Sequence, residues 1–331
     1  MRHHRAMTDG PTPARLKIGL SLPTWPLRDG GYASWHDMRR LARTMDAMGV
    51  DTLWVPDHLQ RATASRGVFG FHECWTILVA AAEATSRIEV GSFIACAGFR
   101  NPALLAKMAM TLDEVSGGRL VLGMGSGVPE RDPSWRAFGF DDARPIARYA
   151  EAAEVVTSLL RDAAPLTFEG ALVRTDGAQL LPRGPRPTSI PVLLAGAGEK
   201  TLAVAARFGD LVNVNRSIAS AGDATAAVAD TAAACRAVGR DPASLAVTGG
   251  ARLAIDGDGV AVEKPGCLAG EPAQVAESIR AIRDAGISHL TMYAGASDDP
   301  SPLPALTDEL LDRFAPFLEA IRATPAEARP N

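Results

Sequence analysis

The chain has 331 residues, of which 47% are apolar and 22% charged, and its formal net charge at pH 7 is -4. This composition is ordinary for a globular enzyme, and the length suits one large barrel or two smaller domains. The net charge argues against a nucleic-acid partner, because no basic stripe is present to neutralise phosphates.

The first residues carry no recognisable secretion signal, because His3 and His4 stand among arginines with no apolar stretch after them. No apolar run approaches the length that spans a bilayer, so no membrane segment is expected. We expect residues 1–14 to be a disordered tail, residues 15–323 to form a single domain, and residues 324–331 to be a second tail. The cysteines have no Cys-x-x-Cys spacing, which predicts reduced thiols in a cytoplasmic protein. They are Cys74, Cys96, Cys235 and Cys267.

Short apolar runs alternate with longer helical patterns along the chain. The runs that predict strands cover residues 16–22, 51–55, 88–95, 120–123, 192–195, 211–214, 245–254 and 288–292. The patterns that predict helices cover residues 34–48, 74–85, 102–116, 146–160, 200–208, 220–238, 271–285 and 303–321. Eight strand–helix pairs in one series favour an α/β fold of the closed (β/α)8 TIM-barrel type. An open doubly wound sheet is the alternative, which the lack of a Gly-x-Gly-x-x-Gly turn after the first strand weakens.

Two stretches interrupt this alternation. Residues 125–190, rich in proline and glycine towards their end, are interpreted as an insertion after strand four, with hairpin-like material around Gly170. Residues 59–72 are expected to form a long loop, which is either a lid or simply mobile.

The most informative stretch is the run from Asp51 to Leu59, where a short apolar strand leads directly into Asp57 and His58. The C-terminal ends of barrel strands carry the chemistry of this fold, and histidine titrates near neutral pH. Neighbours on an extended backbone point to opposite sides, so one of the pair is expected to face a ligand while the other braces it. The alternative is a surface loop in which Asp57 only caps the next element.

Three further segments follow predicted strands: residues 91–102, residues 123–127 with Glu130 after them, and residues 195–201. The last reads Ala-Gly-Ala-Gly-Glu-Lys-Thr and meets the start of a helix. Its free backbone N–H groups and the helix dipole suit a phosphate, with Lys200 adding charge. A plain strand-to-helix turn is the alternative.

In order and spacing these segments resemble the luciferase-like monooxygenase superfamily, and within it the branch that uses the deazaflavin coenzyme F420. The similarity spans about residues 16–320. The motifs that carry it lie at residues 53–58, 90–102, 116–127, 138–140 and 191–210.

The resemblance implies a barrel whose mouth holds the coenzyme ring, with His58 against it and Asp57 nearby. It places a non-proline cis peptide bond between Phe93 and Ile94, and brings a glycine turn close to the ring edge. The turn that follows the fifth strand would hold the coenzyme phosphate. The residues expected to bind the coenzyme are Asp57, Phe93, Ile94, Gly125, Ser126, Gly127, Ala195, Gly196, Ala197, Gly198, Glu199 and Asn213. No metal is expected.

The chain departs from the sugar-phosphate dehydrogenases of the superfamily at two positions. Those proteins have a glutamate directly after the glycine turn, where this chain has Val128, and a tryptophan where it has Ala62. Both differences argue against sugar-phosphate oxidation. Glu130 is a candidate to supply the missing acid, the alternative being a solvated loop carboxylate.

The first functional hypothesis is an F420-dependent oxidoreductase that moves a hydride between the coenzyme and a small organic substrate. His58 would give or take the proton, and Asp57 would hold its tautomer or contact the ring. The alternatives are an FMN-dependent two-component monooxygenase and a flavin-binding barrel without catalysis. An F420 or flavin reductase would supply reduced coenzyme, and the resemblance suggests a homodimer. Five aromatic residues either line an apolar pocket or belong to the core. They are Trp25, Trp54, Phe69, Phe71 and Trp75.

Overall fold

A computed structural model describes residues 15–323 of the protein, apart from residues 28, 65, 257–258, 264–265 and 295–305 and the side chain of residue 215. The two expected tails, residues 1–14 and 324–331, lie outside the described residues.

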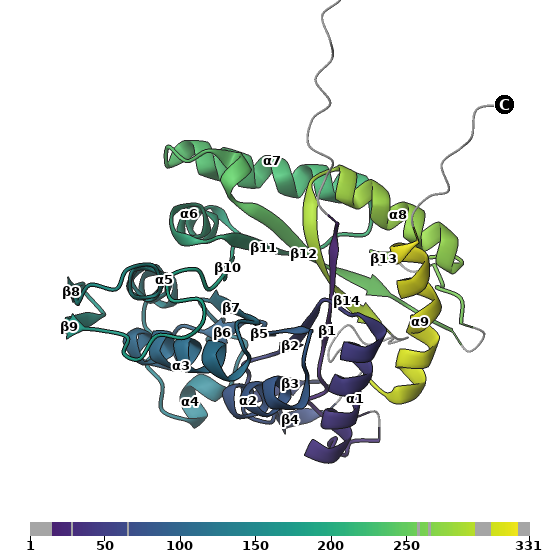
Figure 1. The fold of residues 1–331 in the computed structure, drawn as a ribbon, viewed down its shortest axis with the longest axis horizontal. Helices are drawn as coiled ribbons and strands as arrows, with labels where there is room; N and C mark the ends of the chain where they lie inside the picture. Colours follow the sequence, from purple (N-terminus) through teal and green to yellow (C-terminus); the bar gives the residue numbers. More distant parts are fainter. Residues whose placement is uncertain are drawn as a thin grey trace, which may run out of the picture.

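Eight parallel strands of the described chain close into a barrel (Figure 1). They are β1 (Lys17–Ser21), β2 (Thr52–Val55), β5 (Glu89–Ser92), β7 (Leu120–Gly125), β10 (Val192–Ala195), β11 (Leu211–Ser217), β12 (Ala246–Leu253) and β14 (Ile287–Ala294). Each pairs with the next in this series, and β14 returns to β1. Leu193 lies opposite Gly123 where β10 pairs with β7, in the middle of the ring. The predicted (β/α)8 barrel is therefore confirmed, and the open sheet is excluded.

In the described part of the chain, eight helices surround the barrel, one after each of its strands (Figure 1). They are α1 (Trp35–Met48), α2 (Cys74–Ala84), α3 (Pro102–Val115), α5 (Pro145–Arg161), α6 (Glu199–Phe208), α7 (Ala221–Ala237), α8 (Pro272–Asp284) and α9 (Asp308–Arg322). Each packs against its neighbours in chain order, and α9 packs against α1. At α3, the Asn101 side chain accepts hydrogen bonds from two backbone N–H groups, and Pro102 opens the helix as predicted.

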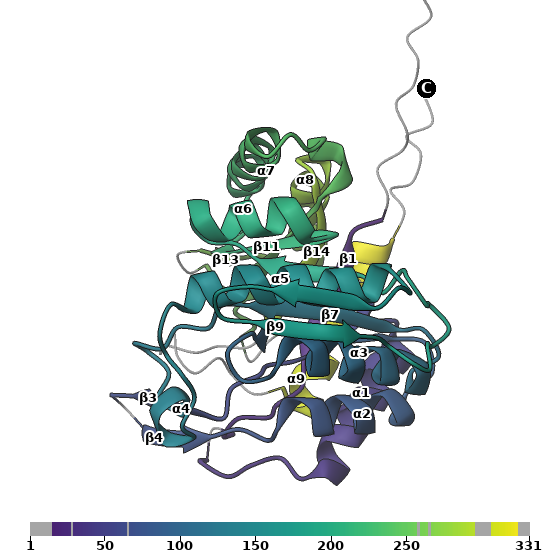
Figure 2. The same cartoon turned by 90° about the vertical axis from the view of Figure 1, so that its left-hand side faces the viewer.

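Three of the shorter elements lie together at one end of the barrel (Figure 2). A hairpin of β3 (Gln60–Thr63) and β4 (Gly67–Gly70) follows β2, and α4 (Ser134–Ala137) follows β7. The Gln60 N–H donates to the Ser134 hydroxyl oxygen at 2.8 Å, and this hydroxyl donates to the Gln60 carbonyl at 3.0 Å. The expectation of a long loop at residues 59–72 is therefore wrong over the hairpin. Further short elements are β6 (Ala95–Cys96), β13 (Cys267–Leu268) and the 3-10 turn Pro242–Ser244.

The segment expected as one insertion, residues 125–190, divides into barrel and added parts. Helix α5 packs between α3 and α6, so it is the fourth helix of the barrel itself. The added parts are residues 126–144 and an antiparallel hairpin of β8 (Leu166–Glu169) and β9 (Arg174–Ala178), which packs on α5 through β8. The expected hairpin near Gly170 is confirmed.

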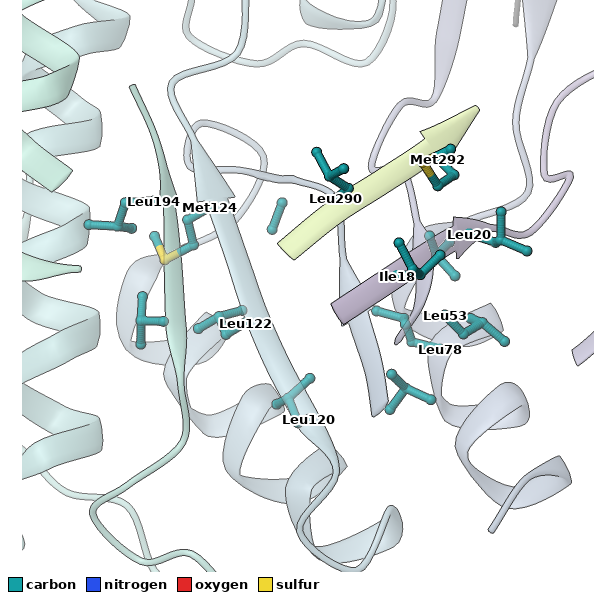
Figure 3. Close-up of a cluster of buried hydrophobic side chains, with 14 of the residues drawn as sticks. Ile18, Leu20, Leu53, Leu78, Leu120, Leu122, Met124, Leu194, Leu290 and Met292 are labelled. Atoms are coloured by element: carbon teal, nitrogen blue, oxygen red, sulfur yellow. The ribbon is translucent and has the colours of Figure 1, made fainter. Parts of the chain in front are cut away.

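The main core lies between the barrel and its helices (Figure 3). Ile18, Leu20 and Leu53 alternate along their strands and pack with Leu78 of α2 in this layer, all of them almost fully buried. Alternate residues of a strand point to opposite faces, which is why the apolar positions recur every second residue. Burial of each such side chain stabilises the fold by about 1.5–3 kcal/mol.

The inside of the barrel is filled by Trp54, which is fully buried. Glycine makes room for it on both neighbouring strands, because a Cβ on Gly19 would lie 2.2 Å from the Trp54 Nε1 and one on Gly91 would lie 2.3 Å from its Cζ3. The His289 ring lies 5.4 Å from the Trp54 ring, and burial lowers the pKa of His289 to about 3. Trp54 is thus a core residue and not part of a pocket wall.

Asp46, in the last turn of α1, holds the chain that enters β5. Its carboxylate accepts hydrogen bonds from the backbone N–H groups of Ser86, Arg87 and Ile88 at 2.8–3.1 Å. Burial acts to raise the pKa of Asp46, but these donors outweigh it and hold the pKa below its ordinary value. A carboxylate of this kind stabilises the fold above its unfolded-state pKa of about 3.9, and this contribution is lost as pH falls through the folded-state pKa.

We therefore expect Asp46→Ala to lower the free energy of unfolding by about 1–3 kcal/mol at pH 7, because three donors lose their acceptor. Urea denaturation is expected to show this difference shrinking as pH falls from about 5 to about 2. Asp312→Ala, on the exposed face of α9, is the matched control and is expected to change stability by less than about 0.5 kcal/mol. A deficit at Asp46 that stayed constant with pH would contradict this account.

Candidate functional site

A cavity of about 680 Å³ opens where the barrel strands end. Its wall includes residues from the ends of β1, β2, β5, β7, β10, β11, β12 and β14, together with the β3–β4 hairpin. Ligand cavities of this fold lie at this end, and the volume is in the range that holds a small organic molecule. The cavity brings together most of the predicted site residues.

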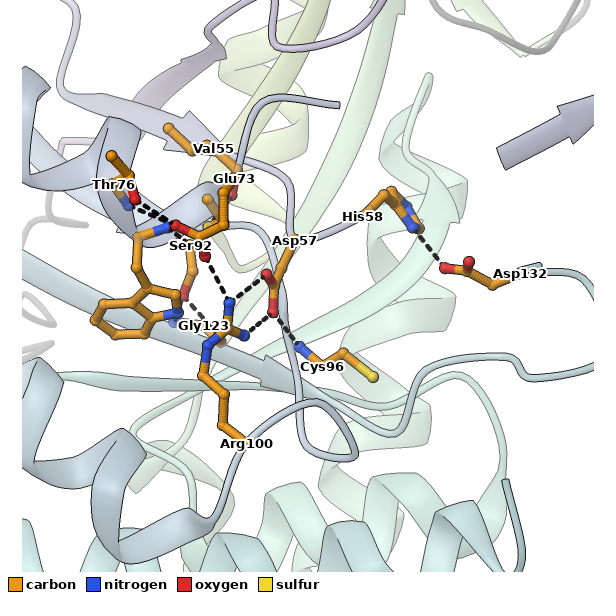
Figure 4. A network of polar contacts seen from close by, with 12 residues as sticks. Val55, Asp57, His58, Glu73, Thr76, Ser92, Cys96, Arg100, Gly123 and Asp132 are labelled. Atoms are coloured by element: carbon orange, nitrogen blue, oxygen red, sulfur yellow. Dashed lines mark hydrogen bonds and ion pairs between the residues drawn. The ribbon is translucent and has the colours of Figure 1, made fainter. Parts of the chain in front are cut away.

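His58 lies in the cavity wall and is paired with Asp132 (Figure 4). The distance between His58 Nδ1 and Asp132 Oδ2 is 2.9 Å, and the Asp132 side chain is only 9% exposed. Burial acts to raise the pKa of Asp132, but hydrogen bonds from His58 and Ser134 hold it below its ordinary value. Among the described residues nothing is hydrogen-bonded to Nε2 of His58, so this nitrogen is available to a ligand.

Asp57 does not hold His58, which corrects the predicted pairing of the two neighbours. Its buried carboxylate contacts Arg100 through both guanidinium NH groups, at 2.5 and 3.0 Å, and accepts the backbone N–H of Cys96 at 2.9 Å (Figure 4). The two side chains leave the backbone in different directions, as expected for neighbours on an extended chain. Asp57 therefore lines the cavity as one half of an ion pair, while Asp132 holds the imidazole.

Arg100 links Asp57 to a second acid, Glu73, at 2.8 Å. Burial acts to lower the pKa of the Arg100 guanidinium, but Asp57 raises it above its ordinary value, so the charge is retained. The prediction omitted both Arg100 and Asp132. The sequence holds a signal for Arg100, which is a charged residue within an apolar run. It holds no signal for Asp132, which is one of three consecutive charged residues at positions 130–132.

The peptide bond between Phe93 and Ile94 is cis, as expected, and both residues line the cavity. Gly125, Ser126 and Gly127 face the same space from the end of β7.

The protein's own packing requires glycine in the turn after β7. A Cβ on Gly125 would lie 2.9 Å from the Ile94 side chain, and one on Gly127 would lie 2.7 Å from the Cys96 sulfur. Gly127 also has a φ of 69°, which favours glycine. These glycines therefore have a packing role of their own, and their closeness to a coenzyme ring stays a prediction.

The turn expected to hold a phosphate lies mostly outside the cavity wall. Ala195 lines the cavity, and Gly196 is buried, but Ala197, Gly198 and Glu199 are exposed at the rim. The N–H groups of Ala197 and Gly198 both donate to the Thr201 hydroxyl at 3.1 Å. Two donors that the phosphate was expected to use are thus engaged within the turn itself.

Of two other predicted residues, one lines the cavity and the other does not. Asn213 is buried in the wall of the cavity, and its side-chain nitrogen lies 3.5 Å from the Thr248 hydroxyl. Glu130 is exposed and is not among the residues that line the cavity. The structure therefore gives Glu130 no place from which to act as the missing acid.

The aromatic residues divide between wall and core. Trp25, Phe69 and Phe71 line the cavity, whereas Trp54 and Trp75 do not. The Phe71 ring lies 5.2 Å from the ring of His58 and 5.7 Å from that of Phe69. Phe69 of the β3–β4 hairpin and Phe71 directly after it thus bring an apolar surface next to the histidine.

The described residues contain no group of three His, Cys, Asp or Glu side chains placed to hold a metal ion. In the same part of the chain, every helix is too short or too polar to cross a membrane. The four cysteines are free thiols, three of them buried.

Comparison with known proteins identifies the family of the chain. The family model described as luciferase-like monooxygenase matches residues 16–264, more than half of the sequence. The chain is 30% identical over 183 residues to a 5,10-methylenetetrahydromethanopterin reductase of Archaeoglobus fulgidus, which covers 55% of this chain and 50% of the relative. It is 31% identical over 185 residues to a 4-hydroxyprotoasukamycin monooxygenase of Streptomyces nodosus subsp. asukaensis, covering 55% and 48%. The chain thus spans about half the length of these curated relatives.

The fold of the chain is similar to that of an F420-dependent secondary alcohol dehydrogenase solved in complex with an F420–acetone adduct. The TM-score is 0.73, and the match covers 93% of this chain and 100% of the other. The sequence identity is 19%, so the likeness establishes the barrel fold alone.

Proposed function

This chain belongs to the luciferase-like monooxygenase family, and from that premise we propose that it is an F420-dependent oxidoreductase acting on a small organic substrate. The observation that carries the proposal is His58, which offers Nε2 to the cavity while Asp132 holds Nδ1. A curated relative is named as an F420-dependent glucose-6-phosphate dehydrogenase, 33% identical over 168 residues. That relative supports the coenzyme and leaves the substrate open.

The cavity wall fits a flat coenzyme ring. Phe93 and Ile94 supply an apolar surface, and Gly125 and Gly127 leave the adjacent turn without side chains. These residues, with Asn213 and the end of β10, would hold the coenzyme. When bound, the coenzyme would supply or accept the hydride.

The protein's own contribution is the position and proton chemistry of His58. An Nδ1–H that donates to Asp132 leaves the Nε2 lone pair of neutral imidazole pointing away from the carboxylate, so Nε2 can take a proton from a substrate hydroxyl. In the reverse direction, the protonated ring donates from Nε2. Asp132 keeps the ring in one orientation, and the Asp57–Arg100 pair fixes the backbone from which His58 projects.

A second candidate function is an FMN-dependent monooxygenase that receives reduced flavin from a separate reductase. The relative named as a 4-hydroxyprotoasukamycin monooxygenase, at 31% identity, favours it. The two functions would use the same cavity and differ in the coenzyme that it binds.

Titration of the purified protein with F420 and, separately, with FMN distinguishes these functions. We expect F420 to bind at least about tenfold more tightly than FMN, and bound F420 to be turned over with a small organic substrate. Ser126→Trp is expected to weaken this binding by more than about tenfold, because it fills the cavity beside the proposed ring site. Ser189→Trp, at an exposed loop position outside the cavity, is the matched control and should leave it unchanged. Tight binding of FMN alone would favour the monooxygenase.

A further inference from the structure

Two cavity arginines flank the His58–Asp132 pair. The segments that carry this pair are joined twice, by the His58–Asp132 contact and by the hydrogen bonds between Gln60 and Ser134. Arg61 directly follows Gln60, Arg131 directly precedes Asp132, and both arginines line the cavity. The fold therefore brings two guanidinium groups to the wall beside the histidine.

The positive charge of these arginines is not balanced by any described residue. The guanidinium groups of Arg61 and Arg131 make no hydrogen bond or ion pair with any part of the chain that the structure describes. The two acids of the cavity wall are already engaged, Asp57 by Arg100 and Asp132 by His58. A guanidinium binds a carboxylate through two parallel hydrogen bonds, and the described residues of this wall leave no carboxylate free for that role.

An apolar surface adjoins the same histidine. Phe71 contacts His58, with Phe69 and Trp25 beyond it at ring distances of 5.7 and 6.4 Å from Phe71. Aromatic side chains favour stacking with flat apolar groups. The wall near His58 thus combines two positive charges with three aromatic rings.

The two other cavity arginines lie on another wall. Arg216 and Arg252 stand at the ends of β11 and β12, and β11 is four strands from β2 around the eight-stranded ring. Arg216 is also paired with Asp230 at 2.6 Å. They therefore lie on the part of the wall formed by the ends of β11 and β12, and the proposed site does not include them.

We propose that the substrate is an aromatic organic acid, whose carboxylate is bound by Arg61 and Arg131 and whose ring lies against Phe69 and Phe71. This assignment rests on the proposed function only in placing the substrate at His58. The site itself is an anion-binding site with an apolar neighbour, and it is tested without turnover.

The test compares two acids with their neutral amides: benzoate with benzamide, and 2-naphthoate with 2-naphthamide. Calorimetric titration of the coenzyme-free protein is expected to give dissociation constants at least about tenfold lower for the acids. Arg61→Gln and Arg131→Gln are each expected to weaken acid binding about tenfold and to leave amide binding unchanged. Arg174→Gln, on the exposed β8–β9 hairpin and paired with Glu169, is the matched control and should have no effect.

Retained amide binding in the variants shows that the cavity is intact. Equal binding of acids and amides, or binding of neither acid, would overturn the proposal, as would unchanged acid affinity in both arginine variants. The same variants are titrated with F420 and FMN, whose own phosphates are anionic. A loss of affinity for the coenzyme instead of the acids would assign the arginines to the coenzyme and overturn the substrate assignment. Failure of F420 to bind any form of the protein would contradict the proposed function and leave the result with the acids standing.

Discussion

Replacing His58 with alanine is expected to slow turnover by about 10²–10⁴-fold while the dissociation constant for the coenzyme changes by less than about threefold. The expectation follows from the geometry of the cavity. Nδ1 of His58 is engaged by Asp132, and Nε2 is the group left to exchange a proton with a substrate. The coenzyme is assigned to the wall formed by Phe93, Ile94 and the glycine turn, which the substitution does not touch.

Steady-state kinetics and a coenzyme titration on the same preparation measure the two effects. His36→Ala, at an exposed position on α1, is the matched control and is expected to keep normal turnover. Asp132→Asn should cause a smaller loss, because the imidazole remains but is no longer held by a charge. Normal turnover by the His58→Ala protein would remove His58 from the reaction and with it the main support for the proposed chemistry.

Replacing Arg100 with methionine is expected to lower the free energy of unfolding by about 3–5 kcal/mol, the largest stability change that we predict. Asp57 has no exposed side-chain surface, and Arg100 supplies its only charged partner among the described residues. Methionine preserves much of the volume and the apolar contacts but leaves the carboxylate buried without a cation. Glu73 loses a contact as well, although its side chain is 41% exposed and loses less.

Urea denaturation of four proteins tests this expectation: wild type, Arg100→Met, Asp57→Asn and the double variant. The double variant should lose less stability than the two single variants together, because it no longer buries an unpaired charge. Arg174→Met breaks the exposed pair with Glu169 and is expected to cost less than about 1 kcal/mol. A loss below about 1 kcal/mol in the Arg100→Met protein would show that water or a rearranged neighbour compensates the Asp57 charge.

The barrel could be predicted because its signals are local and repeated. Apolar strand runs and helical patterns follow one another eight times, and stops such as Gly117 and Gly118, with φ values of 64° and 83°, mark where a helix ends. The hairpin at residues 60–70 was missed because its strands have four residues each, and one of them, Gln60–Thr63, is largely polar. It is held in place by Ser134, a residue more than sixty positions away in the chain.

The partners within the site could not be predicted in the same way. Asp57 and His58 are adjacent in the sequence, which predicted that their side chains contact each other. In the structure each side chain instead binds a residue from another loop. Glu130 and Asp132 are two residues apart, and nothing in their spacing indicates that the second is buried against His58 and the first is exposed. The turn at residues 195–199 has the glycine pattern of a phosphate site, but Thr201 takes two of its N–H groups.

Sequence by itself determined the closed barrel, the end at which its cavity lies, and the presence of His58 and Asp57 in the wall. These follow from periodicity and from where each strand stops, both properties of a few consecutive residues. Only the tertiary structure decided that Asp132 orients the histidine, that Arg100 neutralises Asp57, and that unpaired arginines stand beside them. Such pairings depend on distances between loops that meet because the strands close into a ring, and side-chain contact across a ring has no counterpart in linear spacing.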